Sequence, residues 1–218
     1  MAVKNLGAPK SRLSARLSPM ERRRLTVTLF KMTLAALETV RRMTGVDIAV
    51  ITPSPTIREI AQRHQAEVIV EHRAEGLNMA AHRARAWSEA FGYARLCLLP
   101  ADLAAPDPRD IAALLSAARA TGQPVICPAF DGGTNALVLP LPSTMPFCYG
   151  PGSATRHMAA ARSAGHAPLT LALPSLRDDV DTPAVYARTI SHVAIGAAGA
   201  AEPLETAGKA NVIEAARG

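Results

Sequence analysis

Short apolar runs and helical segments alternate along most of this chain of 218 residues. Hydrophobic spacing predicts helices over about residues 19–43, 56–64, 78–91, 109–120, 153–163 and 183–193. Strands are predicted between them, over about residues 46–51, 68–70, 96–99, 125–127, 136–139 and 169–173. Strands that alternate with helices of this length are joined by right-handed crossovers, which build a mainly parallel sheet covered on both faces. The sequence therefore predicts an α/β fold, arranged as a single three-layer domain.

The first of these helices has a clear start. Ser18 is placed as the N-cap, Pro19 occupies the first helical position and Glu21 completes a capping box. Gly45 is expected to end the helix.

The two ends of the chain differ from its middle. The domain is predicted over residues 1–196, and residues 197–218 are predicted to be a flexible tail because they are rich in Ala, Gly, Glu and Pro without periodicity. A strand before the basic residues near the start would be very short, because only Met1–Val3 precede them.

The net charge of +6 is concentrated near the start of the chain. Residues 1–42 hold ten Lys or Arg against Glu21 and Glu38. Basic clustering suits polyanionic ligands, both nucleic acids and nucleotide phosphates. Four Phe, three Tyr and one Trp are few for base stacking, and no known nucleic-acid-binding motif occurs, which argues against nucleic acid as the partner.

Composition also argues against a membrane or secreted protein. The longest run without strongly polar residues, 193–201, is far shorter than the roughly 18 residues that a membrane span requires. The chain shows no pattern of a secretory leader, and its three cysteines cannot all pair. We expect a cytoplasmic protein with reduced thiols.

Three cations lie in a loop between the start of the chain and the first long helix. Lys4, Lys10 and Arg12 are fixed there, and Gly7 and Pro9 shape the loop. Cations beside turn amides can hold a triphosphate, although the same composition suits a solvated basic loop.

Aspartates follow a predicted strand and precede the last predicted helix. Asp102 comes just after a strongly apolar strand, where open parallel sheets bind their ligands. Asp179 and Asp181 are two residues apart, so in an extended segment both would point the same way and favour a cation between them. The alternatives are a turn residue for Asp102 and, for the second pair, a helix N-cap, a role that Asp181 or Thr182 could fill without any metal.

Two stretches rich in small residues form a further candidate site. They are residues 131–135 and 149–153, and the second opens the helix that carries His157. Glycines beside a helix N-terminus let backbone N–H groups approach an anion, although turn formation alone would also explain them. We expect His157 to pack or to support a neighbouring side chain rather than to act on a substrate.

Several segments occur together in the order and context of one known family. They are AVKNLGAPKSRL, SPMERRRLTVTLFKMTLAAL, EGLNMA, LPADL, GGTNALVL, YGPGSATRHMAAARSAG and DDVDTP. Over about residues 1–192 the chain resembles the 2-phospho-L-lactate guanylyltransferase family, which is related to the molybdenum-cofactor guanylyltransferases. The resemblance implies a Rossmann-like nucleotidyltransferase fold and transfer of GMP from GTP to a small phosphorylated carboxylic acid. That acid is 2-phospholactate, phosphoenolpyruvate or 3-phosphoglycerate, pyrophosphate is released, and the product serves coenzyme F-420 biosynthesis through a downstream transferase.

The resemblance also implies roles for individual residues. The Mg²⁺-binding aspartates match Asp102, Asp179 and Asp181, and the phosphate-binding loop matches Lys4, Lys10 and Arg12. Residues expected near the guanine nucleotide are Gly76, Leu77 and Asn78, and those expected around the phospho-acid are Thr134, Gly150 and Ser153. We expect the acid's phosphate oxygen to attack the α-phosphorus in line, so that positioning and charge neutralisation perform the catalysis.

The chain departs from the family in two places. Members usually carry more strand residues before the counterpart of Val3, and GGTN stands where a slightly different glycine and threonine pattern is common. The alternatives are a nucleotidyltransferase with a molybdopterin-type or sugar-phosphate acceptor, or a noncatalytic module that binds GTP or nucleic acid.

Overall fold

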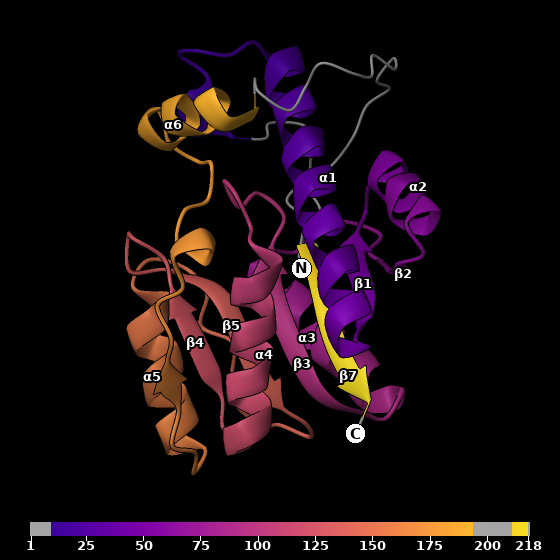
Figure 1. Ribbon diagram of the computed structural model, residues 1–218, viewed down its shortest axis with the longest axis vertical. Coiled ribbons are helices and arrows are strands. Elements are labelled where there is room, and N and C mark those ends of the chain that lie inside the picture. The colour runs from indigo at the N-terminus through magenta and orange to yellow at the C-terminus, as the bar shows by residue number, and fades with distance from the viewer. Residues whose placement is uncertain (1–9, 194–210, 218) are drawn as a thin grey trace.

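The structure is a computed structural model, and it describes residues 10–193 and 211–217. The described helices are α1 (Pro19–Thr44), α2 (Pro55–Arg63), α3 (Leu77–Ala90), α4 (Pro108–Thr121), α5 (Ser153–Ser163) and α6 (Pro183–Val193), with short 3-10 helices η1 (Ser11–Leu13) and η2 (Pro174–Leu176). The described strands are β1 (Asp47–Thr52), β2 (Glu67–Val70), β3 (Tyr93–Pro100), β4 (Val125–Pro128), β5 (Thr134–Pro140), β6 (Leu169–Thr170) and β7 (Asn211–Arg217). Figure 1 shows these elements around one twisted sheet.

The strands form a single sheet in the order β2-β1-β7-β3-β5-β4-β6. β1 and β2 pair in parallel, as do β4 and β6, whereas β7 is antiparallel to β1 and β3, and β5 is antiparallel to β3 and β4. These pairings leave β2, β1, β3, β4 and β6 running in one direction, with β7 and β5 reversed between them. The predicted α/β fold with a mainly parallel sheet is confirmed.

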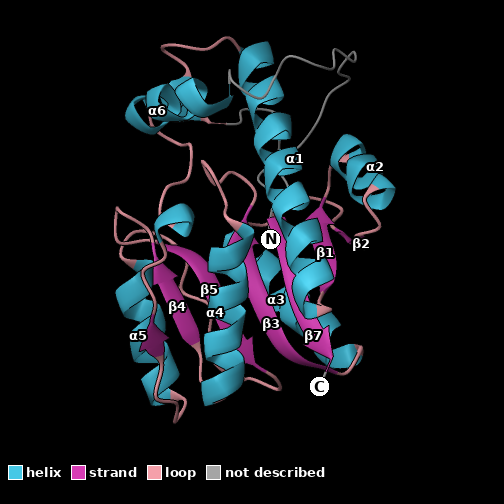
Figure 2. Ribbon diagram, in the orientation of Figure 1, coloured by secondary structure: helices cyan, strands magenta, loops and turns pink. Residues whose placement is uncertain are grey.

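Helices cover both faces of this sheet, as Figure 2 shows. One apolar core joins the sheet to α1, α2 and α4 and includes Phe30, Ile57 and Leu114, all fully buried. The second core lies on the other face, where Ala84 of α3 and Ala161 of α5 pack against the strands. The three layers follow from strands that are buried on both sides, and their apolar runs are the sequence signal of that burial.

The start of α1 is built as predicted. The Ser18 hydroxyl accepts a hydrogen bond from the Glu21 backbone N–H at 3.3 Å, and the Glu21 carboxylate accepts one from the Ser18 N–H at 2.7 Å. This reciprocal cap satisfies backbone donors that the first helical turn otherwise leaves unpaired. Gly45 ends α1 with a φ of 75°, a conformation that glycine adopts without steric cost.

Strand β7 corrects the prediction for the end of the chain. Asn211–Arg217 belong to the segment predicted as a flexible tail, but they pair with β1 on one side and β3 on the other. The segment lacks the alternation that marks a strand, and Glu and Ala are depleted in strands, so local preference could not indicate it. Pairing on both sides outweighs that preference, because without β7 two inner strands would carry unpaired edges.

Other sequence expectations fall partly outside the described residues. The short strand expected at Met1–Val3, residue Lys4 and positions 194–210 and 218 lie there. Strand β6 ends at Thr170, earlier than the predicted 173.

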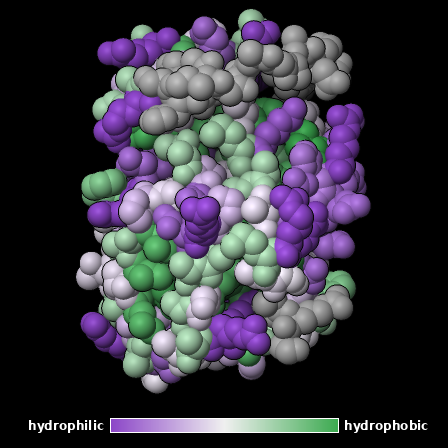
Figure 3. All heavy atoms as spheres, in the orientation of Figure 1, coloured by the Kyte–Doolittle hydropathy of each residue, from purple (hydrophilic) through white to green (hydrophobic). Residues whose placement is uncertain are grey.

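No helix among the described residues is long and apolar enough to cross a membrane. Hydrophilic and hydrophobic surface alternate over the face shown in Figure 3, where hydrophilic side chains are prominent around its upper part.

Candidate active site

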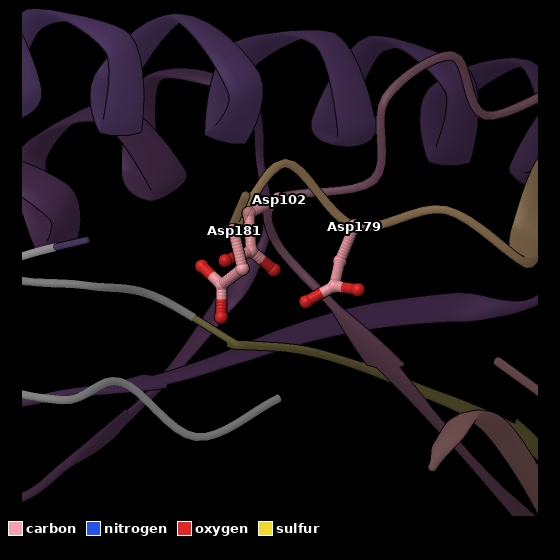
Figure 4. A group of neighbouring side chains, drawn as sticks. All are labelled: Asp102, Asp179 and Asp181. Atoms are coloured by element: carbon pink, nitrogen blue, oxygen red, sulfur yellow. The ribbon is translucent and has the colours of Figure 1, made fainter. Parts of the chain in front are cut away.

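Three carboxylates converge at the carboxyl end of β3. Asp102 is the second residue after that strand, and Asp179 and Asp181 lie in the segment between η2 and α6. One carboxylate oxygen from each lies within 4.8 Å of those of the other two. Figure 4 shows the three side chains side by side, with their carboxylates on the same side of the backbone. We call Asp102, Asp179 and Asp181 the acidic cluster.

Backbone hydrogen bonds hold the two segments of the acidic cluster together. The Val180 N–H donates to the Asp102 carbonyl at 2.8 Å, and the Ala104 N–H donates to the Asp178 carbonyl at 2.9 Å. Leu103 and Asp179 form an isolated antiparallel bridge between them. Segments more than seventy positions apart in the sequence are thereby fixed in register, which brings the predicted metal ligands together.

The ammonium group of Lys10 lies among these carboxylates. Its Nζ donates to Asp102 Oδ2 at 3.0 Å, to the Val180 carbonyl at 2.7 Å and to Asp181 Oδ1 at 3.3 Å. The Lys10 side chain is fully buried, and Lys10 precedes η1 with a φ of 51°. The basic loop of the sequence therefore reaches the acidic cluster through this side chain.

Burial and mutual repulsion shape the electrostatics of the cluster. Burial, with Asp102 and Asp181 close by, raises the pKa of Asp179 to about 7. Burial alone would lower the pKa of Lys10, but the adjacent Asp102 and Asp181 outweigh it and raise that pKa. The raised pKa of Asp179 means that a further negative charge at this position is unfavourable, so a bound cation would stabilise the ionised cluster.

The donor set fits a hard divalent cation. Mg²⁺ prefers oxygen ligands and is held in proteins by one or two carboxylates together with substrate phosphates. The acidic cluster offers carboxylate oxygens within reach of one another, at the sheet edge where substrates bind in this class of fold. Asp102, Asp179 and Asp181 can therefore hold such an ion.

A cavity of about 570 Å³ opens beside Asp179 and Asp181. Arg12, Arg177 and Arg188 contribute to its lining. Arg12 therefore lies near the carboxylate of Asp181, which Lys10 also contacts.

A second polar group lies where β5 begins and α5 starts. The Thr134 Oγ1 is 2.9 Å from His157 Nδ1 and accepts a hydrogen bond from the Ser153 hydroxyl at 3.1 Å. His157 and Ser153 are both buried, whereas Thr134 is partly exposed. We call Thr134, Ser153 and His157 the hydroxyl cluster. Because β5 runs antiparallel to β3, its start lies at the edge where β3 ends, the edge that carries the acidic cluster.

The loop between β5 and α5 is held from two sides. The Tyr149 N–H donates to Asn78 Oδ1 at 2.8 Å, and Asn78 Nδ2 donates to the Tyr149 carbonyl at 3.4 Å. Arg156 donates to the Cys148 carbonyl at 2.8 Å. Gly150 has a φ of 130°, and a Cβ there would lie 3.1 Å from the Arg156 guanidinium, which explains the glycine.

Hydrogen bonds connect the segment expected near guanine, at the start of α3, with the loop expected around the phospho-acid. Gly76 is the N-cap of α3 with a φ of 96°, and Asn78 in the first turn binds the backbone beside Gly150. The contacts of Asn78 show that it shapes the loop, a role that the sequence did not indicate. Sequence reasoning also missed Arg156 and the Val180 carbonyl, because both roles depend on contacts between distant segments.

Comparison with known proteins gives a consistent result. A family model described as "Guanylyl transferase CofC like" matches residues 1–176. The 3-phospho-D-glycerate guanylyltransferase of Colwellia psychrerythraea is 35% identical over 174 residues, which cover 80% of this chain and 81% of that relative. The phosphoenolpyruvate guanylyltransferase of Rubrobacter xylanophilus is 36% identical over 188 residues, covering 85% and 89%.

The fold has a counterpart among solved structures. A crystal structure described as a nucleotide-diphospho-sugar transferase from Desulfovibrio desulfuricans G20 aligns with a TM-score of 0.59 at 19% identity, covering 81% of this chain and 77% of that one. This likeness supports the predicted Rossmann-like nucleotidyltransferase fold. The matches in sequence go further, and they show that the chain belongs to the CofC-like guanylyl transferase family.

Proposed function

We propose that this protein transfers GMP from GTP to a small phosphorylated carboxylic acid. A phosphate oxygen of the acid forms a bond to the α-phosphorus of GTP, and the bond from that phosphorus to the β-phosphate oxygen breaks. Pyrophosphate leaves with the electron pair, and the acid is joined to GMP through a new diphosphate linkage. The convergence of Asp102, Asp179 and Asp181 in a chain of this family carries the proposal.

The acidic cluster would hold Mg²⁺, which when bound supplies positive charge to the phosphates. The chain's own residues position the reactants. Lys10 fixes the directions of Asp102 and Asp181 through its buried ammonium group, and Arg12 lines the adjoining cavity, where it can neutralise a leaving pyrophosphate. Lys4 is proposed to assist from the same loop.

The acid is proposed to bind between the two clusters. Thr134 and Ser153 present hydroxyl groups. The loop at Gly150 leads into the N-terminus of α5, where backbone N–H groups favour an anion. Gly76 and Asn78 lie at the start of α3, on the side proposed for guanine. The relatives act on phosphoenolpyruvate or 3-phospho-D-glycerate according to their names, so these acids and 2-phospholactate are the candidates. The product would pass to a downstream transferase of coenzyme F-420 biosynthesis.

Pyrophosphate release tests the proposal. Purified protein with Mg²⁺ and GTP is incubated with 2-phospholactate, phosphoenolpyruvate, 3-phosphoglycerate or no acid, with ATP in place of GTP as a parallel series. We expect release with GTP and at least one acid, together with a new diphosphate signal in ³¹P NMR. A folded protein that binds GTP but releases no pyrophosphate with any acid would contradict the proposal and favour another acceptor or a binding module.

A further inference from the structure

His157 is the residue that joins the hydroxyl cluster to the loop before α5. It follows Ser153 by four positions, so both side chains lie on one face of α5. His157 Nδ1 lies 2.9 Å from Thr134 Oγ1, and His157 Nε2 lies 2.9 Å from the Cys148 backbone nitrogen. The ring is fully buried, with the Tyr149 ring edge-on at 4.8 Å between centroids.

The contact with Cys148 determines where the imidazole carries its proton. A backbone N–H can only donate, so His157 Nε2 must accept the hydrogen bond through its lone pair. A neutral imidazole has one N–H, which therefore lies on Nδ1. Burial, reinforced by the nearby Arg156, lowers the pKa of His157 to about 4, so the ring stays neutral at physiological pH. His157 Nδ1 is consequently a donor to Thr134 Oγ1.

This tautomer determines the direction of the hydrogen bonds in the cluster. The imidazole N–H and the two hydroxyl groups carry three hydrogens, and the two contacts that join these groups use two of them. With Ser153 as the donor to Thr134, the third hydrogen is that of the Thr134 hydroxyl, and Thr134 is the partly exposed member. If Nδ1 were instead an acceptor, it would take the Thr134 hydrogen and leave oxygen lone pairs facing an anionic substrate.

We propose that His157 is a positioning residue for the acceptor substrate: through Nδ1–H it orients the Thr134 hydroxyl to donate to an anionic oxygen of the phospho-acid. The proposal rests on the proposed function, since it assumes that a phospho-acid binds at Thr134 and Ser153. A packing histidine would occupy the same volume without this directional effect.

The tautomer is tested first, by two-bond ¹⁵N–¹H correlation spectra of protein labelled at its histidines. We expect the signals of His157, assigned by their loss in His157→Gln, to show a protonated Nδ1 and a bare Nε2 at pH 7. A His157 protonated at Nε2 would overturn the proposal, and this readout requires no enzymatic activity.

Two substitutions separate the two ring nitrogens. The amide of His157→Asn lies near the Nδ1 position and can still donate to Thr134, whereas that of His157→Gln reaches the Nε2 position and can accept from Cys148. A hydrogen bond to a charged group contributes roughly ten- to a hundredfold in binding. We expect His157→Gln to raise KM for the acid about tenfold or more, His157→Asn to raise it less than about threefold, and KM for GTP to stay within about twofold in both.

A double-mutant cycle with Thr134→Val shows whether His157 acts through Thr134. We expect the effect of His157→Gln on the acid's KM to fall below about twofold in the Thr134→Val background, because the oriented hydroxyl is already absent. The matched control is His166→Gln, beyond the other end of α5, which should leave both KM values and the melting temperature unchanged. Equal effects of Asn and Gln, or additive effects in the cycle, would overturn the proposal. An inactive wild-type protein would instead contradict the proposed function itself, so the two failures are distinguishable.

Discussion

The acidic cluster and the hydroxyl cluster lie at the same edge of the sheet but differ in how they hold charge. In the acidic cluster, two of the three carboxylates pair with one buried ammonium group, and the pKa of Asp179 rises to about 7 because burial and its neighbours oppose ionisation. In the hydroxyl cluster, burial keeps His157 neutral, and the cluster holds its geometry through hydrogen bonds between uncharged groups.

The difference indicates a division of labour. A cluster of like charges stores repulsion that a cation or substrate can relieve, so its occupancy should affect the stability of the whole protein. A neutral network has little charge to relieve, and its value lies in the direction of its donors. Substitutions in the acidic cluster should therefore change stability as well as activity, and those in the hydroxyl cluster chiefly the recognition of one substrate.

The largest effect is expected for Asp102→Asn. Loss of this carboxylate should lower kcat/KM by about three orders of magnitude or more, because it removes transition-state charge stabilisation at the phosphates. The measurement is pyrophosphate release at saturating GTP, with circular dichroism to confirm folding. The matched control is Glu59→Gln, on the exposed surface of α2, which should keep full activity. Retained activity in Asp102→Asn would remove the basis for the metal assignment.

Lys10→Met should destabilise the protein through repulsion between the carboxylates of the acidic cluster. Removing the buried ammonium group leaves partly buried carboxylates facing one another without a counter-charge, which should lower the free energy of unfolding by about 3 kcal/mol. Denaturation in urea measures this, with and without Mg²⁺. We expect added Mg²⁺ to stabilise Lys10→Met more than the wild-type protein, since the ion can replace the lost positive charge. If Mg²⁺ stabilises both proteins equally, the acidic cluster and Lys10 are not coupled as described.

Asp179→Asn should change how stability depends on pH. The unfolded chain ionises this carboxyl near pH 4, whereas the folded protein holds the proton to about pH 7, so the wild-type free energy of unfolding should fall as pH rises through that window. The asparagine variant has no carboxyl group to ionise at this position, so its free energy of unfolding lacks this dependence on pH. Measured by urea denaturation in the presence of a chelator, its stability relative to wild type should increase by roughly 2 to 3 kcal/mol between pH 5 and pH 8. An unchanged difference would show that Asp179 ionises normally.

Ser153→Ala should produce the smallest effect. It removes one neutral hydrogen bond to Thr134, which we expect to raise KM for the acid by about three- to tenfold while stability and KM for GTP change little. The effect should be constant between pH 6 and pH 8, because His157 stays neutral over that range. Initial rates at varied acid concentration test this, and a strong pH dependence would show that the hydroxyl cluster carries charge after all.

Local signals made much of the fold predictable. The capping box at Ser18, the prolines that start α2, α4 and α6, and the apolar runs of the inner strands specify elements within a few residues. The acidic cluster could also be predicted in part, because Asp102 follows a buried strand and the resemblance links it to Asp179 and Asp181.

The remaining features depend on contacts between distant segments. Lys10 was expected at a phosphate, but its position beside Asp102 depends on packing across 92 positions of sequence. The tautomer of His157 depends on a backbone N–H in a separate loop. The spacing of four residues from Ser153 to His157 was the one available signal. It indicates that both side chains share a helix face, but it does not indicate the hydrogen bonds of His157 to Thr134 and Cys148.

Strand β7 bears on how the chain reaches this structure. The strands on either side of it, β1 and β3, end at Thr52 and Pro100, whereas β7 begins at Asn211. The middle of the sheet therefore joins residues more than 110 positions apart, and such distant pairing slows folding because a long loop must close first. During synthesis, β1 and β3 emerge from the ribosome well before the strand that lies between them. The nascent chain would hold two unpaired inner strand edges until β7 has been synthesised, so this protein should need protection from aggregation during that interval.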